Sequence, residues 1–398
     1  MRRNTGTILL ACVAVLCVTA AVTAQLPKLA EPFATPSVRN NVQIVAKPDA
    51  SQLKAPAGFE VSLYADNLRA PRTMLLAPNG DVFVAQSGPG SVTILRDANN
   101  DGTPETRSTY AQGLSGVFGM ALHDGYLYLG RTDSIVRYKY APGDSEAKGT
   151  PEKLVDMPTG GHSTRNIIFS RDGKKMYVAV GSQSNKNAGE PPIRAAISEY
   201  NPDGTGQRIY ASGLRNPVGL ALQPGTDIIW TSVNERDTLG DDLVPDYITS
   251  VKDGAFYGWP YSYIGSNPDP EHVGKMPDLV RRALVPDVLI TAHSAAVSVN
   301  FYTGTQFPQR YRNGAFVGLH GSWNRSKVSG YRIGFVPFQN GKPSGPIEDF
   351  VTGWIVDGGT PATAWGRPVG TLVMRDGSML VADDAGNKIW KVRYTGKN

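Results

Sequence analysis

The feature that most restricts the fold of this sequence is a repeated pair of short apolar runs joined by a tight turn. Each copy starts with polar or glycine-containing residues, turns at a pair such as Asn79-Gly80 or Asp376-Gly377, and ends in a second apolar run. Such turns are typical of β-hairpins. The copies span residues 70–86, 116–130, 162–180, 215–232, 295–319 and 366–383. Because no segment shows a long helical apolar period, the pattern predicts an all-β chain.

Further strands flank most of these pairs, for example residues 59–66 before the first pair and residues 91–97 after it. A unit of four strands is too small to bury both of its faces, so repeated units have to pack against one another. Six such units predict a six-bladed β-propeller of four-stranded antiparallel blades. We expect this domain to span residues 58–398, after a signal peptide at 1–24 and a proline-rich extension at 25–57.

The amino-terminal end has the pattern of an export signal. Arg2 and Arg3 precede an apolar run that closes on small residues before Gln25. This pattern predicts a periplasmic or secreted protein, and an uncleaved membrane anchor is the alternative. Both cysteines, Cys12 and Cys17, lie inside this leader. Without it the chain has no thiol for a disulfide, a thiolate metal site, covalent haem or an iron–sulfur cluster, so redox chemistry would need an organic cofactor.

The charge of the chain is mildly basic. It contains 40 lysines and arginines and 35 acidic residues, and no run of five like charges occurs. This distribution argues against nucleic acid as a partner.

Polar residues stand directly before several of the predicted inner strands. In a propeller the innermost strands line one channel, so we expect these side chains to meet at one mouth of it. Guanidinium groups that converge in this way can bind the carboxylates of an anion bidentately. The alternative is that each arginine pairs only with neighbouring carbonyl or acidic groups. The residues are Arg72, His162, Arg165, Arg215, Asn216 and Arg367.

His162 is the candidate general base, because a neutral imidazole can take a hydroxyl proton near neutral pH. The chain has five histidines, and His162 is the one placed at the start of an inner strand. His293 and His320 are the next candidates. A structural role is the alternative for His162.

Two long loops, 233–277 and 320–332, are expected to carry function, with capping or dimerisation of the propeller as the alternative. The stretch NERDTLGDD in the first loop holds four acidic residues. Oxygen ligands at this density suit Ca²⁺. The EF-hand spacing is absent, and a solvated acidic loop is the alternative.

Five segments, in this order, resemble the glucose/sorbosone dehydrogenases, which are quinoproteins that use pyrroloquinoline quinone. The resemblance spans residues 58–395 and is closer to the sorbosone dehydrogenase branch than to the soluble glucose dehydrogenases. It implies hydride transfer from a sugar, or a related aldehyde or alcohol, to the quinone. Because the chain has no haem site, we expect its electron acceptor, a quinone or a cytochrome, to be a separate molecule. The segments are GGHSTRNIIFSRDGKKMYVAVGS, SGLRNPVGLAL, NERDTLGDDLVPDYI leading into FYGWPYSYIG, HGSWNRSKVSGYRI and GRPVGTLVMRDGSMLVADDAGNKIWKV.

The resemblance further implies roles for individual residues. A histidine at the position of His162 takes the proton of the sugar hydroxyl. Arg215 and Asn216 would lie against the quinone oxygens, where negative charge develops. Arg367 matches an arginine that contacts a carboxylate of the cofactor.

Several positions depart from the soluble glucose dehydrogenases. Their cofactor-bound Ca²⁺ would fall on the backbone carbonyls of Asp237 and Thr238, where those enzymes have Gly-Pro, so the Asp237 carboxylate could join the ligands. Ser182 replaces an acidic residue that would orient His162. The cofactor-binding lysine has no counterpart, and Arg325 or Lys327 is expected to supply its charge.

Two other functions fit the same scaffold. A calcium-dependent lactonase or esterase would activate water at a metal ion in the channel, and fold alone does not exclude it. A non-catalytic propeller would bind peptide or glycan. The arginines and the histidine at the predicted mouth favour oxidation of a small-molecule sugar, and a homodimer is compatible with the sequence.

Overall fold

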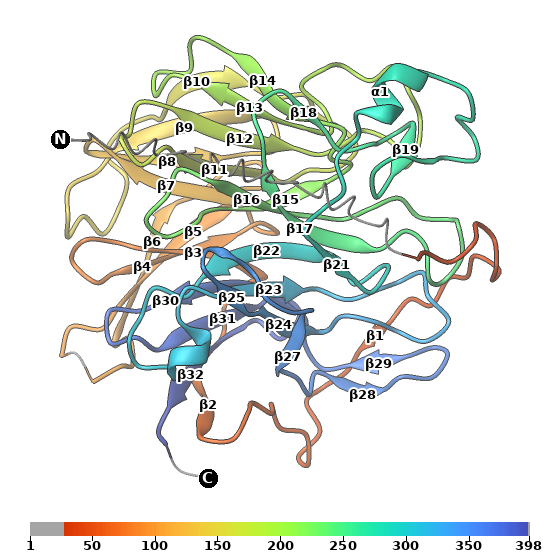
Figure 1. The fold of residues 1–398 in the computed structure, drawn as a ribbon. Helices are drawn as coiled ribbons and strands as arrows, with labels where there is room; N and C mark the ends of the chain where they lie inside the picture. Colours follow the sequence, from red (N-terminus) through yellow and green to blue (C-terminus); the bar gives the residue numbers. More distant parts are fainter. Residues whose placement is uncertain (1–27, 100, 397–398) are drawn as a thin grey trace, which may run out of the picture.

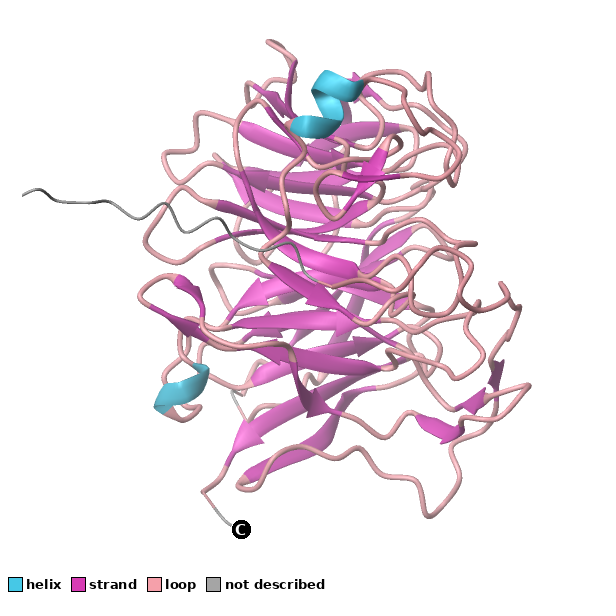
Figure 2. Cartoon of the chain, turned by 45° about the vertical axis from the view of Figure 1, so that its right-hand side comes forward, coloured by secondary structure: helices cyan, strands magenta, loops and turns pink. Residues whose placement is uncertain are grey.

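The computed structural model describes residues 28–99 and 101–396. Almost all regular structure in this part of the chain is β-strand, so the predicted all-β class is confirmed (Figure 2). The helices are α1 (Pro277–Arg281) and the 3₁₀ turn η1 (Gln309–Tyr311). None of the helices in these ranges is long and apolar enough to cross a membrane. The predicted signal peptide lies outside the described residues.

Antiparallel sheets of four strands, one of them extended by a fifth, contain most of the strands in the described ranges (Figure 1). The first two sheets are β3 (Pro71–Leu76), β4 (Val82–Gln86), β5 (Ser91–Arg96) and β6 (Thr106–Ala111), then β7 (Gly119–His123), β8 (Tyr126–Gly130), β9 (Ser134–Lys139) and β10 (Glu152–Asp156). The third is β11 (Arg165–Phe169), β12 (Met176–Val180), β13 (Ala196–Tyr200) and β14 (Arg208–Ser212), with β18 (Ala255–Phe256) added in parallel. The fourth and fifth are β15 (Pro217–Leu222), β16 (Ile229–Val233), β17 (Asp246–Val251) and β21 (Val288–Ile290), then β22 (Ala296–Phe301), β23 (Ala315–Leu319), β24 (Arg332–Val336) and β27 (Glu348–Val351). The last is β30 (Pro368–Val373), β31 (Met379–Asp383), β32 (Lys388–Tyr394) and β2 (Phe59–Ala65).

Three smaller sheets lie outside these. They are β1 (Gln43–Ile44), β29 (Thr363–Ala364) and β28 (Ile355–Asp357); β19 (Ser262–Tyr263) and β20 (Asn267–Pro268); and β25 (Phe338–Gln339) and β26 (Lys342–Pro343).

Each repeated hairpin of the sequence is the first pair of strands in one large sheet. The first strands β3, β7, β11, β15, β22 and β30 contact one another in a closed cycle, as in a β-propeller. The second strands β4 and β16 are buried along their whole length. Strands covered on both faces need apolar residues at nearly every position, which explains why these runs are apolar rather than alternating.

Strand β2 pairs with β32, the last strand, and not with the hairpin that follows it in sequence (Figure 1). Phe59 lies opposite Tyr394 in this antiparallel pair. The strand expected at residues 59–66 is present, but it belongs to the last sheet rather than to the sheet of the first hairpin. The reason is geometric, since a closed cycle of sheets is completed by joining its two ends.

Residues 28–54, which we call the strap, pack against loops of the propeller. The Asp241 amide donates to Thr35 Oγ1 at 2.7 Å, and strand β1 of the strap pairs with β29. Asn40 is buried, and its side chain donates to the carbonyls of Ser326 and Gly359 at 3.2 Å each. The strap therefore joins both long loops that the sequence analysis singled out.

Candidate active site

Four buried apolar side chains form a floor between the inner strands. They are Phe118, Val218, Val297 and Val369, and each lies at or next to the start of a first strand. The same strands line a cavity of about 240 Å³. Asn216 and Arg367 stand two positions before Val218 and Val369. Residues at the starts of β15 and β30 are therefore placed around one floor, and we call this end of the channel the mouth.

The residues that follow the second strands also reach the mouth, because in an antiparallel hairpin the second strand ends beside the start of the first. The Ser182 amide donates to the Arg215 carbonyl at 2.8 Å, and the Asp384 amide donates to the Arg367 carbonyl at 3.1 Å. Asp384 is not among the residues predicted for the mouth, because those were the residues before the first strands. Its position directly after the second apolar run of a hairpin was the available signal.

His162 lies at the mouth with its ring fixed by Ser182. Its Nδ1 atom is 2.8 Å from the Ser182 carbonyl oxygen and 3.2 Å from Ser182 Oγ. A carbonyl can only accept, so Nδ1 carries the proton and Nε2 has a free lone pair. Burial, and then the charge of Arg215, lower the pKa of His162 to about 4. The imidazole is therefore neutral at pH 7. Although Ser182 replaces an acidic residue at this position, its carbonyl orients the His162 ring.

Arg215 lies close to His162, but its guanidinium is fully engaged by the protein. Nε donates to the Asn185 carbonyl at 3.1 Å, and Nη1 donates to the Asn234 and Glu235 carbonyls at 3.2 and 2.7 Å. Nη2 donates to the Asn185 amide oxygen and to the Asp237 carboxylate, both at 3.0 Å. A guanidinium has five N–H donors, so all are used. Arg215 thus brings positive charge to the site, while a direct bond to a ligand would require one of these bonds to be exchanged.

Asn216 packs directly against His162 and Gly181. Its side-chain oxygen is buried and has no hydrogen-bond partner among the described residues. A Cβ atom on Gly181 would lie 2.3 Å from this oxygen and 2.6 Å from the Cβ of His162. Glycine is therefore required at 181, and the unsatisfied oxygen points to a group that this chain does not supply.

The Arg367 guanidinium has N–H groups that are free to bind a ligand. Nε donates to the His320 carbonyl at 3.0 Å and Nη2 donates to the Gly321 carbonyl at 2.9 Å. Its guanidinium lies 5.4 Å over the ring of Tyr331. Nη1 makes no hydrogen bond to any described residue, so this arginine can bind an anion without giving up a contact.

Arg165 does not belong to the mouth as expected. It is fully buried, and it donates to the carbonyls of Pro158, His162 and Thr164 at 2.6 to 2.8 Å. For this residue the structural alternative was correct. Arg165 shapes the turn that carries His162.

The predicted calcium turn lies beside Arg215. The Asp237 carboxylate accepts from Arg215 and, at 2.7 Å, from Asn324, with His293 Nδ1 at 3.6 Å. The Asp237 carbonyl accepts from Asn185 and Arg236, both at 3.1 Å. Thr238 has a φ of 74°, which is unusual for a β-branched residue. Its carbonyl accepts no hydrogen bond from the described residues and is the unengaged oxygen of this turn.

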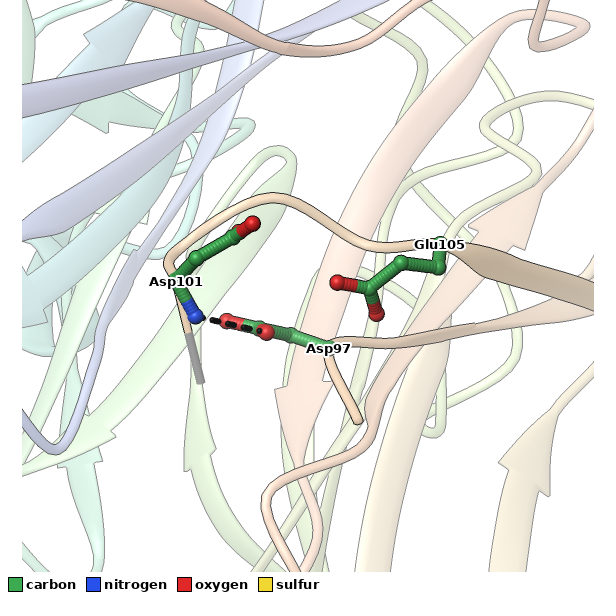
Figure 3. A group of neighbouring side chains, drawn as sticks. All are labelled: Asp97, Asp101 and Glu105. Atoms are coloured by element: carbon green, nitrogen blue, oxygen red, sulfur yellow. Dashed lines mark hydrogen bonds between the residues drawn. The ribbon is translucent and has the colours of Figure 1, made fainter. Parts of the chain in front are cut away.

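The acidic residues of the NERDTLGDD stretch do not form one cluster. Glu235 is buried, while Asp241 accepts from the Ser326 amide at 3.0 Å and Asp242 pairs with Arg325. Among the described residues, a group of three acidic side chains close enough to share a metal ion lies elsewhere, on the hairpin between β5 and β6 (Figure 3). They are Asp97, Asp101 and Glu105.

Arg325 and Lys327, the predicted substitutes for the missing lysine, lie in the 320–332 loop. Arg325 Nε donates to the Asp241 carbonyl at 3.1 Å and Nη1 donates to the Lys327 carbonyl at 2.9 Å. With its pairing to Asp242, this guanidinium holds the two long loops together. Lys327 is exposed.

Two curated relatives are similar to this chain over most of its length. An uncharacterized protein of Borreliella burgdorferi is 29% identical over 370 residues, which cover 89% of this chain and 94% of the relative. A pyrroloquinoline quinone-dependent pyranose dehydrogenase of Coprinopsis cinerea is 24% identical over 411 residues, covering 86% of this chain and 54% of the relative. The chain therefore spans about half the length of that enzyme.

A solved structure has the same fold. The calcium structure of the Trichoderma reesei enzyme of carbohydrate-active family AA12 superposes with a TM-score of 0.75 at 19% identity, covering 89% of this chain and 99% of that one. Residues 53–248 and 280–395 match the model of the TrAA12-like family. This match extends over most of the propeller and includes His162, Arg215 and Arg367. The chain therefore belongs to the TrAA12-like family.

Proposed function

We propose that this chain is an exported dehydrogenase that uses pyrroloquinoline quinone to oxidise a sugar, or a related aldehyde or alcohol, on a six-bladed propeller. The observation that carries the proposal is the mouth itself. A neutral His162 with a free Nε2 lies beside Arg215, and Arg367 lies over the same apolar floor. The family match and the name of the Coprinopsis cinerea relative support the cofactor, and the closed cycle of first strands supports the number of blades.

The residues at the mouth fit a flat polycarboxylate. The free Nη1 of Arg367 can bind a carboxylate, whereas the unsatisfied Asn216 oxygen can only accept and is suited to a hydroxyl donor. The buried floor supplies an apolar surface and keeps water away from one side. For Ca²⁺, the oxygens of Asp237 and Thr238 are ligands of the right kind.

The residues of the chain perform the proton chemistry. When bound, pyrroloquinoline quinone would accept the hydride, with Ca²⁺ as a Lewis acid. His162 Nε2 takes the proton of the substrate hydroxyl as the C–H bond is broken. The Ser182 carbonyl accepts the Nδ1 proton throughout and so holds the ring in the required tautomer. Asp237 favours the imidazolium that forms, and Arg215 opposes it, so the base returns its proton readily.

We propose that the leader directs the protein to the periplasm or out of the cell, and that a quinone or cytochrome takes its electrons. Outside the leader the chain has no cysteine for covalent haem attachment, and we propose that this acceptor is a separate molecule. The sorbosone branch remains our expectation for the substrate.

Reconstitution tests the function. The purified protein is given pyrroloquinoline quinone and Ca²⁺ and screened with aldoses, sorbosone and lactones, with reduction of a dye as the readout. We expect quinone binding and aldose- or sorbosone-dependent dye reduction. Failure to bind the quinone at micromolar concentration overturns the proposal, and hydrolysis of lactones without the quinone would establish the calcium-dependent lactonase instead.

A further inference from the structure

Two arginines that are far apart in the sequence lie at the starts of neighbouring first strands, at the mouth. Arg72 is the second residue of β3, and Arg367 directly precedes β30, the neighbouring first strand. Burial lowers the pKa of Arg72, and the nearby charge of Arg367 lowers it further, partly offset by Asp384. Two half-buried guanidinium groups of like charge are unfavourable neighbours unless an anion compensates them.

The described residues supply one carboxylate for these two cations. Asp384 Oδ2 lies 3.3 Å from Arg72 Nη1. His320 Nε2 lies 2.9 and 3.0 Å from the two oxygens of the same carboxylate, which fixes its orientation. Burial lowers the pKa of His320 to about 4, so it adds no charge at neutral pH. The cluster of Arg72, His320, Arg367 and Asp384 therefore carries an excess of one positive charge.

Both guanidinium groups have unused donors. Arg72 Nε is buried and has no hydrogen-bond partner among the described residues, and Arg367 Nη1 is likewise unpaired there. The Arg72 guanidinium lies 5.4 Å over the ring of Phe118, a residue of the floor. This contact places its charge at the mouth rather than at the outer rim. An anion bound here would accept hydrogen bonds from these unpaired N–H groups and would compensate their charge.

We propose that Arg72 is a ligand-binding residue which, together with Arg367, holds a carboxylate of the cofactor and replaces the lysine that this chain lacks. Asp384 is the counter-ion of Arg72, and His320 positions Asp384. The inference rests on the proposed function, which supplies a polycarboxylate as ligand. Arg325 is not needed for this role, since its donors hold the loops that carry Asp241 and Lys327.

Substitutions of Arg72 and of Asp384 are expected to change ligand binding in opposite directions. Arg72→Gln removes the guanidinium donors and the positive charge that would bind the ligand, so ligand binding weakens. Asp384→Asn removes an anion that repels the ligand carboxylate but keeps an oxygen that Arg72 can bond, so binding tightens. A residue pair with only a structural role would weaken binding in both variants, or in neither.

The test measures binding to the apoprotein, without turnover. Titration with pyrroloquinoline quinone is followed by protein fluorescence, and benzene-1,3,5-tricarboxylate serves as a second probe in thermal-shift experiments. Arg72→Gln should weaken quinone binding about 10- to 100-fold, the size expected for a charged hydrogen bond. Arg72→Lys, which keeps the charge, should fall between wild type and Arg72→Gln. Asp384→Asn should bind the quinone several-fold more tightly at low salt.

The control is Arg393→Gln, an exposed arginine on β32 of the same sheet as β30, which should bind as wild type does. If both Arg72 variants bind the quinone as tightly as wild type, the role of Arg72 is overturned while the proposed function stands. Unchanged or weaker binding by Asp384→Asn overturns the counter-ion role. If the wild-type protein binds neither probe, the proposed function itself fails.

Discussion

The Nδ1 atom of His162 lies 2.8 Å from the carbonyl oxygen of Ser182, so the orientation of the base depends on a backbone group. A carbonyl accepts the Nδ1 proton without adding a negative charge, whereas a carboxylate would stabilise the imidazolium strongly. Burial, and then the charge of Arg215, lower the pKa of His162 to about 4, and the hydrogen bond to the Ser182 carbonyl offsets only part of this lowering.

A carboxylate placed at 182 should therefore raise the pKa of His162. In Ser182→Asp, the new charge lies next to Nδ1, and we expect the pKa to move from about 4 towards or above its ordinary value. NMR titration of the imidazole nitrogens measures it. In Ser182→Ala the carbonyl remains, so the pKa should stay low; an equal rise in both variants would contradict the role of the carbonyl.

Removal of the imidazole should stop turnover and spare cofactor binding. His162→Gln lacks a proton acceptor, and we expect kcat of the reconstituted enzyme to fall about 10²- to 10⁴-fold. His123→Gln is the matched control, because His123 ends β7 at the opposite end of that strand from the mouth and stacks on Phe169. Activity retained in His162→Gln would show that another residue is the base.

Gly181→Ala should displace the base without unfolding the chain. The added methyl group would lie 2.6 Å from the Cβ of His162 and 2.3 Å from the Asn216 oxygen, so both side chains have to move. Misplacement of a catalytic group by about 1 Å costs on the order of 100-fold in rate. Gly88→Ala, where the nearest atom is 3.6 Å away, is the control, and its kcat should be unchanged.

The buried Glu235 makes stability depend on pH. Burial raises its pKa from 4.5 to about 7, and one of its oxygens has no partner among the described residues. Between these values the folded protein binds more protons than the unfolded chain, so this contribution to stability is complete below pH 4.5 and is lost as the pH rises through 7. Glu235→Gln should abolish that loss, gaining on the order of 1–3 kcal/mol relative to wild type between pH 5 and pH 8. Denaturant unfolding at both pH values measures it, and a parallel pH dependence in the two proteins would contradict the prediction.

Loss of the Asn40 side chain should loosen the loops that it joins. Asn40→Ala removes its hydrogen bonds to Ser326, Gly359 and the Ala362 amide. Amide hydrogen exchange in residues 320–329 and 355–362 should accelerate, because those backbone groups open more often. The hairpin between β5 and β6, whose described residues make no hydrogen bond to the strap, is the internal control. Exchange that rises equally in both regions would indicate global destabilisation instead.

The hairpins could be predicted from sequence because a turn and its two flanking strands are local. The partner of β2 could not, since nothing near Phe59 identifies Tyr394 as its neighbour. The direction of an arginine side chain could not be predicted from the sequence either. Arg165 and Arg367 both adjoin the start of a first strand, yet one is fully buried under carbonyl groups and the other keeps free donors. The difference depends on which loops pack over each guanidinium.

The pairing of β2 with β32 has a consequence for the assembly of the molecule. One sheet draws its strands from both ends of the described chain, so that sheet stays open until residues 388–394 have emerged and folded. Until then β32 lacks a neighbour, and any chain shortened before Tyr394 presents bare strand edges to other molecules. Carboxy-terminal truncation should therefore produce aggregates rather than a smaller soluble enzyme. A fusion partner is better joined through a linker that leaves β32 free to pair with β2.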